Sequence, residues 1–262
     1  MKLFNIISNL RLSLEFTSRD LKERYVGTNF GQLWLIISPL ISIFIYTIIF
    51  SDFMKMRMNL IGSKYAYSIY LIPGLLTWTF FNNVMMRLTN SIFEKAGIIK
   101  KINVPMYVYY VSILLTEFIF YIISIILGLI FLLIIGHKIT VDFLYLIPLM
   151  IMVGVFAMSL GVVFSLLNPF FKDLKEVIPI VLQLWFWMTP IIYVKTMVAN
   201  KYPFLIEFNP VFYFVEPLQN IFLYGKILNY KEVFISVSIA FSMLLIAGFL
   251  YKKLIDEIKD II

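Results

Sequence analysis

Residues 104–136 read VPMYVYYVSILLTEFIFYIISIILGLIFLLIIG, and Glu117 is the only charged side chain among them. A helix rises 1.5 Å per residue, so about 20 residues cross the roughly 30 Å hydrocarbon layer of a bilayer. Because this run is longer than one crossing needs, we expect its helix to be tilted or broken. The run predicts a helical protein that spans a membrane.

The composition of the whole chain agrees with that prediction. Of 262 residues, 61% are hydrophobic and 14% are charged, whereas soluble domains hold about 45–50% apolar and about 25% charged residues. The net charge of +7 favours loops that face anionic membrane lipids over a nucleic-acid partner. The absence of cysteine and the single histidine, His137, exclude thiolate chemistry and argue against a histidine metal site or catalytic relay. We therefore expect no metal and no cofactor on this chain.

Five further stretches are long and apolar enough to cross the bilayer. They cover residues 30–50, 66–86, 143–167, 177–194 and 233–251. Residues 202–225, by contrast, contain three prolines and two carboxylates, which favours two short re-entrant helices over a span. The predicted fold is a single all-α integral membrane domain over residues 1–262, with six transmembrane helices.

Residues 1–25 are predicted to form an amphipathic helix at the membrane surface, because apolar residues recur there at helical spacing and a charged run follows. The loop charges set the orientation of the bundle. With the N-terminus in the cytoplasm, 14 of the 22 basic residues lie inside and 8 lie outside. This bias predicts that both termini are cytoplasmic.

The loop between the second and third predicted spans is the strongest candidate for a contact site. Ser91 and Glu94 have the spacing of a helix capping box, and Pro105 blocks continuation of the helix. Residues 91–103 are therefore predicted to form a short helix on the cytoplasmic surface. The pattern leaves open whether this helix is a lipid-bound connector or docks a soluble partner. The docking candidates are Ile92, Phe93, Glu94, Lys95, Ile99 and Lys100.

Glu117 suggests a proton relay, since carboxylates inside a membrane are costly and often functional. No Lys, Arg, His or second carboxylate shares its span, however, and a relay needs a chain of such groups. We favour a structural glutamate that faces the helix bundle, with Arg87 as a possible partner.

Aromatic side chains cluster in the first, second and fifth predicted spans. Most aromatic residues of membrane proteins belong to the interfacial belts or to the core. A sharper interpretation is an aromatic conduit along which flat rings contact sugar faces weakly and repeatedly. Its candidates are Tyr46, Trp185, Phe186 and Tyr193.

The chain contains no phosphate-binding loop. No glycine is followed four residues later by Gly-Lys-Ser or Gly-Lys-Thr, and Gly225-Lys226 is followed by Ile227. Any energy from nucleotide hydrolysis must therefore come from another chain.

Several segments resemble the ABC-2 type permeases that export bacterial surface polysaccharide. They are residues 19–31 (RDLKERYVGTNFG) with the following Leu33-Trp34 and Pro39-Leu40, residues 171–179 (FKDLKEVIP), residues 185–193 (WFWMTPIIY) and residues 209–213 (NPVFY). The likeness covers nearly the whole chain in the right order. It is strongest to O-antigen exporter permeases, with teichoic-acid and capsule exporter permeases more distant.

The resemblance implies a half-transporter of the bacterial inner membrane. Two copies would form the conduit for a lipid-linked polysaccharide, and two ATP-binding subunits carrying ATP and Mg would dock beneath them. The coupling helix of the family falls on residues 92–102, and its external gate helices on residues 202–225. The lipid-linked substrate would enter near the N-terminal helix, past Arg19, Lys22, Arg24, Lys172 and Asp173.

Two other classes of protein compete with this interpretation. A membrane-embedded acyl- or glycosyltransferase needs clustered acid–base or metal-binding residues at one membrane face, and such residues are scattered here. A proton- or sodium-coupled secondary transporter is disfavoured by the isolated Glu117 and by the lack of an internal repeat. We therefore expect a transport subunit without an enzymatic site of its own.

Overall fold

The computed structural model describes residues 2–49, 65–99, 104–199 and 201–261, and these residues form helices and turns without a strand. In chain order the elements are α1 (Lys2–Glu23), η1 (Gly31–Leu33), α2 (Trp34–Thr47), α3 (Ala66–Ile99), α4 (Met106–Ile134), η3 (Val141–Tyr145), α5 (Leu146–Leu167), α6 (Leu174–Met188), α7 (Lys195–Ala199), α8 (Phe204–Glu207), α9 (Phe212–Tyr224) and α10 (Tyr230–Ile261).

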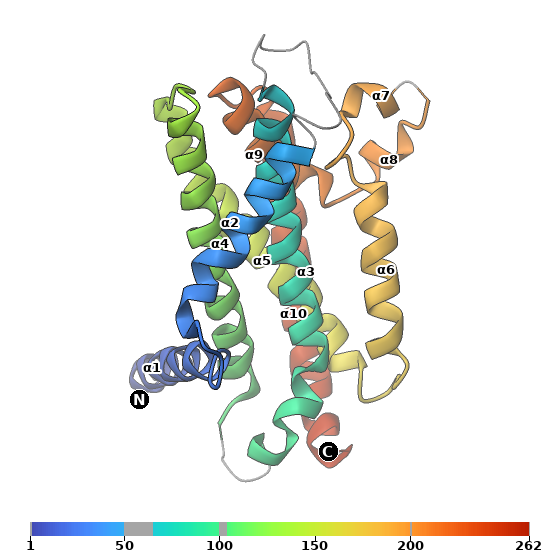
Figure 1. Cartoon of the computed structure of the whole chain (residues 1–262). Helices are drawn as coiled ribbons and strands as arrows, with labels where there is room; N and C mark the ends of the chain where they lie inside the picture. Colours follow the sequence, from blue (N-terminus) through green and yellow to red (C-terminus); the bar gives the residue numbers. More distant parts are fainter. Residues whose placement is uncertain (1, 50–64, 100–103, 200, 262) are drawn as a thin grey trace.

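Helix α3 is the centre of the molecule. It packs against α4, α5 and α9, and α5 packs in turn against α10 (Figure 1). The approach of α3 to α5 is close, since a Cβ atom on Gly161 of α5 would lie only 2.7 Å from a methyl carbon of Leu88. The interior is filled by large apolar side chains such as Phe81, Tyr110, Tyr121 and Phe222. Interlocked side chains from these helices therefore form one core.

Local sequence signals explain where the helices end. Pro105 precedes the first residue of α4, a position where a missing N–H costs nothing. Gly136 follows the other end of α4 with φ of 73°, and the N–H of His137 donates to the carbonyl of Leu132 at 2.9 Å. A glycine in the left-handed conformation with this bond is a common C-terminal helix stop. Gly225 ends α9 with φ of 68°.

Three helical segments of the described chain are long and apolar enough to cross a membrane, namely Met106–Ile134, Val141–Leu167 and Tyr230–Ile258. Large apolar side chains on their outer faces, such as Phe241 and Phe249 of α10, are exposed, as expected for surfaces that contact lipid or another subunit. The all-helical membrane class is confirmed, whereas the count of six spans stays a prediction. Both chain ends lie at the same end of the bundle, where α1 runs across it (Figure 1).

Some predicted elements differ in their bounds. The helix expected over residues 30–50 is shorter as α2, and residue 50 lies outside the described part. Helix α4 is one unbroken helix. The helix expected over residues 177–194 ends at Met188, because Thr189 takes an extended backbone conformation and Pro190 follows it. The two short helices expected within residues 202–225 correspond to α8 and α9.

The largest difference concerns the helix that was predicted to begin at Ser91. Helix α3 continues through this residue without a break to Ile99. The Ser91 side chain is buried, and its hydroxyl donates to the Leu88 carbonyl at 2.6 Å, so Ser91 is an interior helix residue and not an N-cap. The predicted capping box is wrong. Residues 100–103 of the predicted element lie outside the described residues.

Candidate functional site

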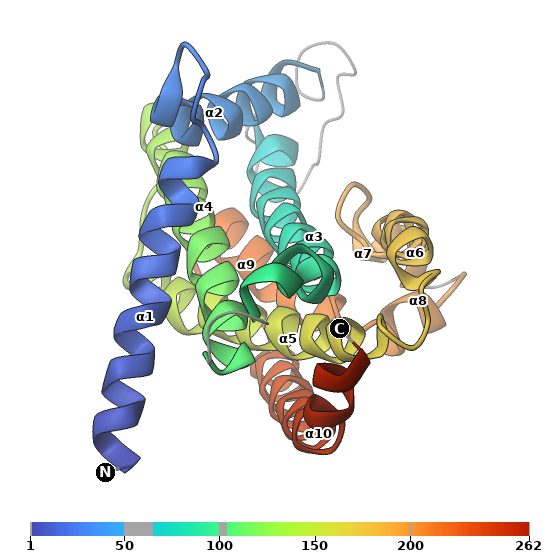
Figure 2. The same cartoon turned by 90° about the horizontal axis from the view of Figure 1, so that it is seen from below.

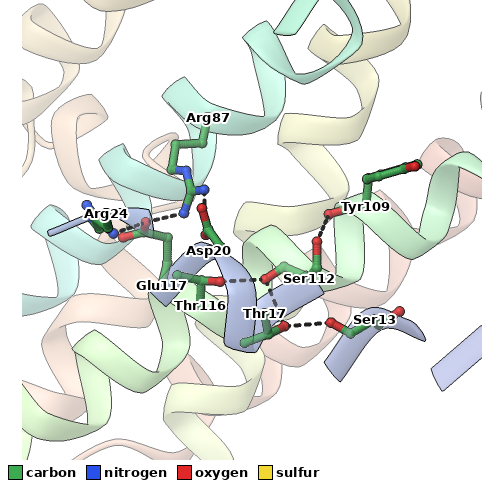
Figure 3. Close-up of polar contacts among 9 residues, drawn as sticks. All are labelled: Ser13, Thr17, Asp20, Arg24, Arg87, Tyr109, Ser112, Thr116 and Glu117. Atoms are coloured by element: carbon green, nitrogen blue, oxygen red, sulfur yellow. Dashed lines mark hydrogen bonds and ion pairs between the residues drawn. The ribbon is translucent and has the colours of Figure 1, made fainter. Parts of the chain in front are cut away.

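Four charged side chains meet where the end of α1 lies against α4 (Figure 3). They come from α1, the turn that follows it, α3 and α4. The Glu117 carboxylate of α4 is 1% exposed and accepts hydrogen bonds from both Arg24 and Arg87, each at 2.7 Å. Arg87 of α3 also pairs with Asp20 of α1 at 2.7 Å. We call Asp20, Arg24, Arg87 and Glu117 the α1-end cluster. Two positive and two negative charges balance, so this cluster can exist in a partly buried place without an uncompensated charge.

The residues of α1 that face α4 form a polar stripe. Ser13 and Thr17 are buried, and their hydroxyls lie 3.2 and 3.3 Å from the carbonyls of Val108 and Ser112. With Asp20 and Arg24 they recur every three or four residues, the spacing of one helix face. The apolar residues of α1, such as Ile7, Leu10 and Leu14, are instead exposed. Helix α1 thus turns its polar face to the protein and apolar side chains outward, which suits a helix embedded in a membrane interface.

A cavity of about 200 Å³ opens beside the α1-end cluster, between α2, α3 and α4. Arg24 and Glu117 form its charged end, and the Arg24 guanidinium also lies 4.3 Å from the centre of the Phe120 ring. The rest of its wall mixes hydroxyl, amide and aromatic side chains, namely Tyr25, Trp34, Ser38, Ser42, Tyr46, Thr79, Asn83, Tyr121 and Ser124, with apolar neighbours. The cavity therefore offers hydrogen-bonding groups next to flat rings.

The predicted substrate-access residues are divided between two places. Arg24 belongs to the α1-end cluster, while Arg19 pairs with Glu23 at 2.6 Å and Lys22 is exposed on α1. Lys172 and Asp173 lie in the turn between α5 and α6, on the opposite side of the molecule from α1 (Figure 2). One chain does not bring these five residues together.

The predicted conduit residues also lie apart. Tyr46 lines the cavity between α2 and α4. Trp185 and Phe186 of α6 pack on Trp78 of α3, with ring centres 6.5 and 5.5 Å apart. Tyr193 follows α6, and its hydroxyl donates to the Trp187 carbonyl at 2.9 Å. In a single chain Trp185 and Phe186 hold α6 against α3.

A buried asparagine connects the end of α6 to the start of α9. The Asn209 side-chain oxygen accepts from the Trp185 indole N–H at 2.8 Å and from the Val211 backbone N–H at 3.1 Å. Its amide nitrogen donates to the Thr189 hydroxyl at 2.9 Å. Residues 185–193 and 209–213, which the sequence marked separately, therefore form one hydrogen-bonded unit. Asn209 and its role were not predicted.

The predicted docking residues divide between core and surface. Ile92 is fully buried in the core, so it cannot touch a partner directly. Phe93 is 47% exposed, and Glu94 beside it is also exposed. They line a groove of about 540 Å³ together with Asn90, Lys172 and Lys175. The side chains of Lys95, Ile99 and Lys100 lie outside the described part of the structure.

The expected partner of Glu117 is confirmed, since Arg87 binds it directly. Asp20 and the second arginine, Arg24, were missed as members of the same cluster. The signal was present in the sequence, because Ser13, Thr17, Asp20 and Arg24 recur at helical spacing. A polar stripe on a helix with exposed apolar residues indicates that the polar side faces protein.

Comparison with known proteins assigns a family to this arrangement. The family model described as ABC-2 type transporter matches residues 14–223. The O-antigen export system permease protein RfbA of Klebsiella pneumoniae is 30% identical over 256 residues, covering 96% of this chain and 95% of that protein. The RfbA protein of Myxococcus xanthus is 22% identical, over 95% of this chain and 94% of its own length. The polysialic acid transport protein KpsM of Escherichia coli is 22% identical, over 84% and 86%.

These matches and the long apolar helices define a multi-pass membrane protein of the transport class. The chain belongs to the ABC-2 type transporter family. The family that the sequence segments indicated is confirmed.

Proposed function

We propose that this chain is the permease subunit of an ATP-driven exporter that moves a lipid-linked, O-antigen-like polysaccharide across the bacterial inner membrane. The observation that carries the proposal is the match over nearly the full length to a relative named as an O-antigen export permease. We keep a capsule or teichoic-acid exporter as the alternative, to which the less similar relative named for polysialic acid transport gives weaker support. Family membership argues against the membrane-embedded transferase and the secondary transporter.

The groove beside Phe93 and Glu94 is the proposed docking site for the ATP-binding subunit. It lies at the end of the bundle that holds both chain termini (Figure 1), which the charge bias predicts to be cytoplasmic. The exposed Phe93 ring supplies an apolar anchor, and aromatic anchors dominate many protein interfaces. Lys172 and Lys175 supply two positive charges to the lining of the same groove. ATP and Mg would bind to the partner, two copies of which would serve two copies of this chain.

The conduit is proposed to form between two copies of the chain, on the side of α3 that lies between α2 and α6 (Figure 2). Ser38 of α2, Thr79 of α3 and Gln183 of α6 belong to the three helices that border this side, and they are exposed and polar. Polar groups inside a membrane are costly unless they face water or protein. A polar path shared by two copies satisfies them. Tyr46, which lines the adjacent cavity, remains our aromatic candidate for this path.

Complementation tests the proposed export function. The chain is expressed together with a candidate ATP-binding subunit from the same organism in a bacterium whose own O-antigen permease gene has been deleted. We expect O-antigen to return to the cell surface, as measured by antibody binding to intact cells. Polymer that stays in the cytoplasm, although the chain is correctly inserted and bound to its ATPase, would contradict the O-antigen assignment. The same test in a capsule-permease deletion strain examines the alternative.

A further inference from the structure

A second charged cluster lies at the end of the bundle opposite α1, where α7, α9 and α10 begin or approach one another (Figure 1). The Lys195 ammonium contacts the Glu216 carboxylate and lies 3.4 Å from the Glu232 carboxylate. Asn229 donates a hydrogen bond of 3.0 Å to the same Glu232 oxygen. We call Lys195, Glu216 and Glu232 the α7-end cluster.

The α7-end cluster is not balanced. Among the residues that the structure describes, two carboxylates face one ammonium group here, which leaves a net charge of −1 when all three side chains are ionised. Both carboxylates are more than nine-tenths buried. A buried charge without a partner is costly because the surroundings cannot replace the water that solvated it. The cluster therefore needs one further positive charge to become neutral.

The unpartnered atoms show where that charge can be placed. Each carboxylate binds Lys195 through its Oε1 atom, and the buried Oε2 atoms of Glu216 and Glu232 have no hydrogen-bond partner among the described residues. Both carboxyl groups contact the same Lys195 ammonium group, which holds them next to each other. One proton on either group creates an O–H donor that the other group accepts. A single proton would thus neutralise the cluster and satisfy both oxygens.

We propose that Glu216 and Glu232 form a proton-binding site whose occupancy sets how closely α7, α9 and α10 are held together. With the proton bound, the carboxyl pair and Lys195 connect all three helices through hydrogen bonds and ion pairs. Without it, the carboxylates repel one another, and Lys195 offsets only one of the two charges. The three helices are therefore held closely at low pH and more loosely at high pH.

The surroundings of the pair are consistent with this site. Burial and the neighbouring Glu232 carboxyl group raise the pKa of Glu216 to about 7, against the opposing effect of Lys195. Among the described residues, the other titratable groups that face the pair are the phenols of Tyr70 on α3 and Tyr213 on α9, and a phenol ordinarily titrates near pH 10. A cavity of about 140 Å³ between Lys195, Glu216 and Gln219 gives protons access.

A distance measurement tests the proposal. The chain has no cysteine, so Thr196→Cys and Leu228→Cys place two spin labels at defined positions. Both residues are exposed and line the same cavity, one on α7 and one just before α10. In the full-length chain in detergent, we expect the separation of the labels to increase between about pH 5.5 and about pH 8.5, as the site loses its proton.

Two variants identify the responsible group. Glu216→Gln keeps the shape of the side chain, and its amide donates to Glu232 in place of the proton, so the labels should stay close at both pH values. Glu232→Gln should act in the same way, which protects the test if one variant folds poorly. His137→Gln is the matched control, because His137 is the only histidine of the chain. An imidazole ordinarily changes its charge between about pH 5 and about pH 8, and burial lowers the pKa of His137. This variant should leave the response unchanged.

Three results would overturn the proposal. They are a separation that does not change with pH, a change that persists in both glutamine variants, and a change that disappears in the His137→Gln variant. The proposal goes beyond the proposed function and does not depend on what is transported. The distance is measured without nucleotide or polysaccharide, so a failure of the export test and a failure of this test can be told apart.

Discussion

Both charged clusters of this protein combine basic and acidic side chains, but they differ in the balance of positive and negative charge. At the α1 end, two arginines meet two carboxylates, and the buried Glu117 oxygen is bound by both guanidinium groups. At the α7 end, one lysine meets two glutamates, and each glutamate keeps a buried oxygen that has no partner in the described part of the chain. A balanced cluster fixes helices at any pH near neutrality, whereas a cluster one charge short responds to protons. The comparison separates a structural role from a sensing role.

The largest effect is expected from breaking the balanced cluster. Glu117→Leu leaves two arginines with the single carboxylate of Asp20, and removing one partner from a buried ion pair costs about 3–5 kcal/mol. We expect a matching loss in the free energy of unfolding, measured by chemical denaturation in detergent. Glu15→Leu is the control, since Glu15 pairs with Arg11 on the exposed face of α1 and should contribute at most about 1 kcal/mol. Equal losses of unfolding free energy in both variants would contradict the structural role of Glu117.

The uncharged hydrogen bonds of Asn209 should be less costly to break than the ion pairs of Glu117. Asn209→Ala leaves the Trp185 N–H and the Thr189 hydroxyl without their present partner, and unsatisfied buried groups cost about 1–3 kcal/mol. Thermal unfolding in detergent measures the loss. Asn29→Ala, at an exposed position in the turn after α1, should have almost no effect. If Asn209→Ala unfolds at the same temperature as the parent chain, the connection between α6 and α9 does not depend on this side chain.

The docking groove lies on the protein surface, whereas both charged clusters contain buried carboxylates. Replacing Phe93 and Glu94 by alanine removes exposed groups, so folding should be unaffected. If the ATP-binding subunit docks there, its affinity should fall about tenfold, which corresponds to about 1.4 kcal/mol. Titration of the purified subunits measures the affinity, and export in cells should fall in parallel. Tyr230→Ala, exposed at the opposite end, serves as the control, and unchanged affinity in the double variant would exclude this groove.

The smallest expected effect is the pH dependence of stability that Glu216 gives to the α7-end cluster. Because the pKa of Glu216 is raised in the folded chain, the unfolded chain loses this proton at lower pH than the folded chain does. The free-energy penalty that Glu216 imposes on the folded state is absent below the ordinary glutamate pKa and grows as pH rises toward about 7. Between about pH 6 and about pH 8 the folded state should lose about 1 kcal/mol. Glu216→Gln should flatten this slope, measured as denaturation midpoints across pH, and a slope that survives would have another source.

Much of the fold follows from the sequence alone. The apolar run around Glu117 required a helix, because backbone groups in lipid must form their hydrogen bonds within the segment. Pro105 and Gly136 gave its two ends to within a few residues. The capping-box interpretation of Ser91 failed because its hydroxyl serves the interior of a longer helix. A local pattern cannot distinguish a helix start from a helix interior when packing covers the residue.

Charge partners were less accessible to sequence reasoning. Arg87 could be proposed for Glu117 because it is predicted near the cytoplasmic end of the second span, which precedes the span of Glu117 in the chain. Arg24, which is 93 residues away from Glu117, was assigned to another role. The link between Trp185 and Asn209 was missed although both segments had been marked. In each case the chemistry of the side chain was visible, but its partner depended on how the helices rotate and cross.

The sequence by itself determined the helical membrane class and the family, together with the absence of a phosphate-binding loop. These properties depend on local composition and on short segments, which keep their meaning wherever the chain folds. Only the tertiary structure decided that Asp20 and Arg24 join Arg87 and Glu117, that Ile92 is buried, and that two glutamates share one lysine. Balance of charge is a property of a place in the fold, because only packing brings residues distant in the sequence into one low-dielectric site.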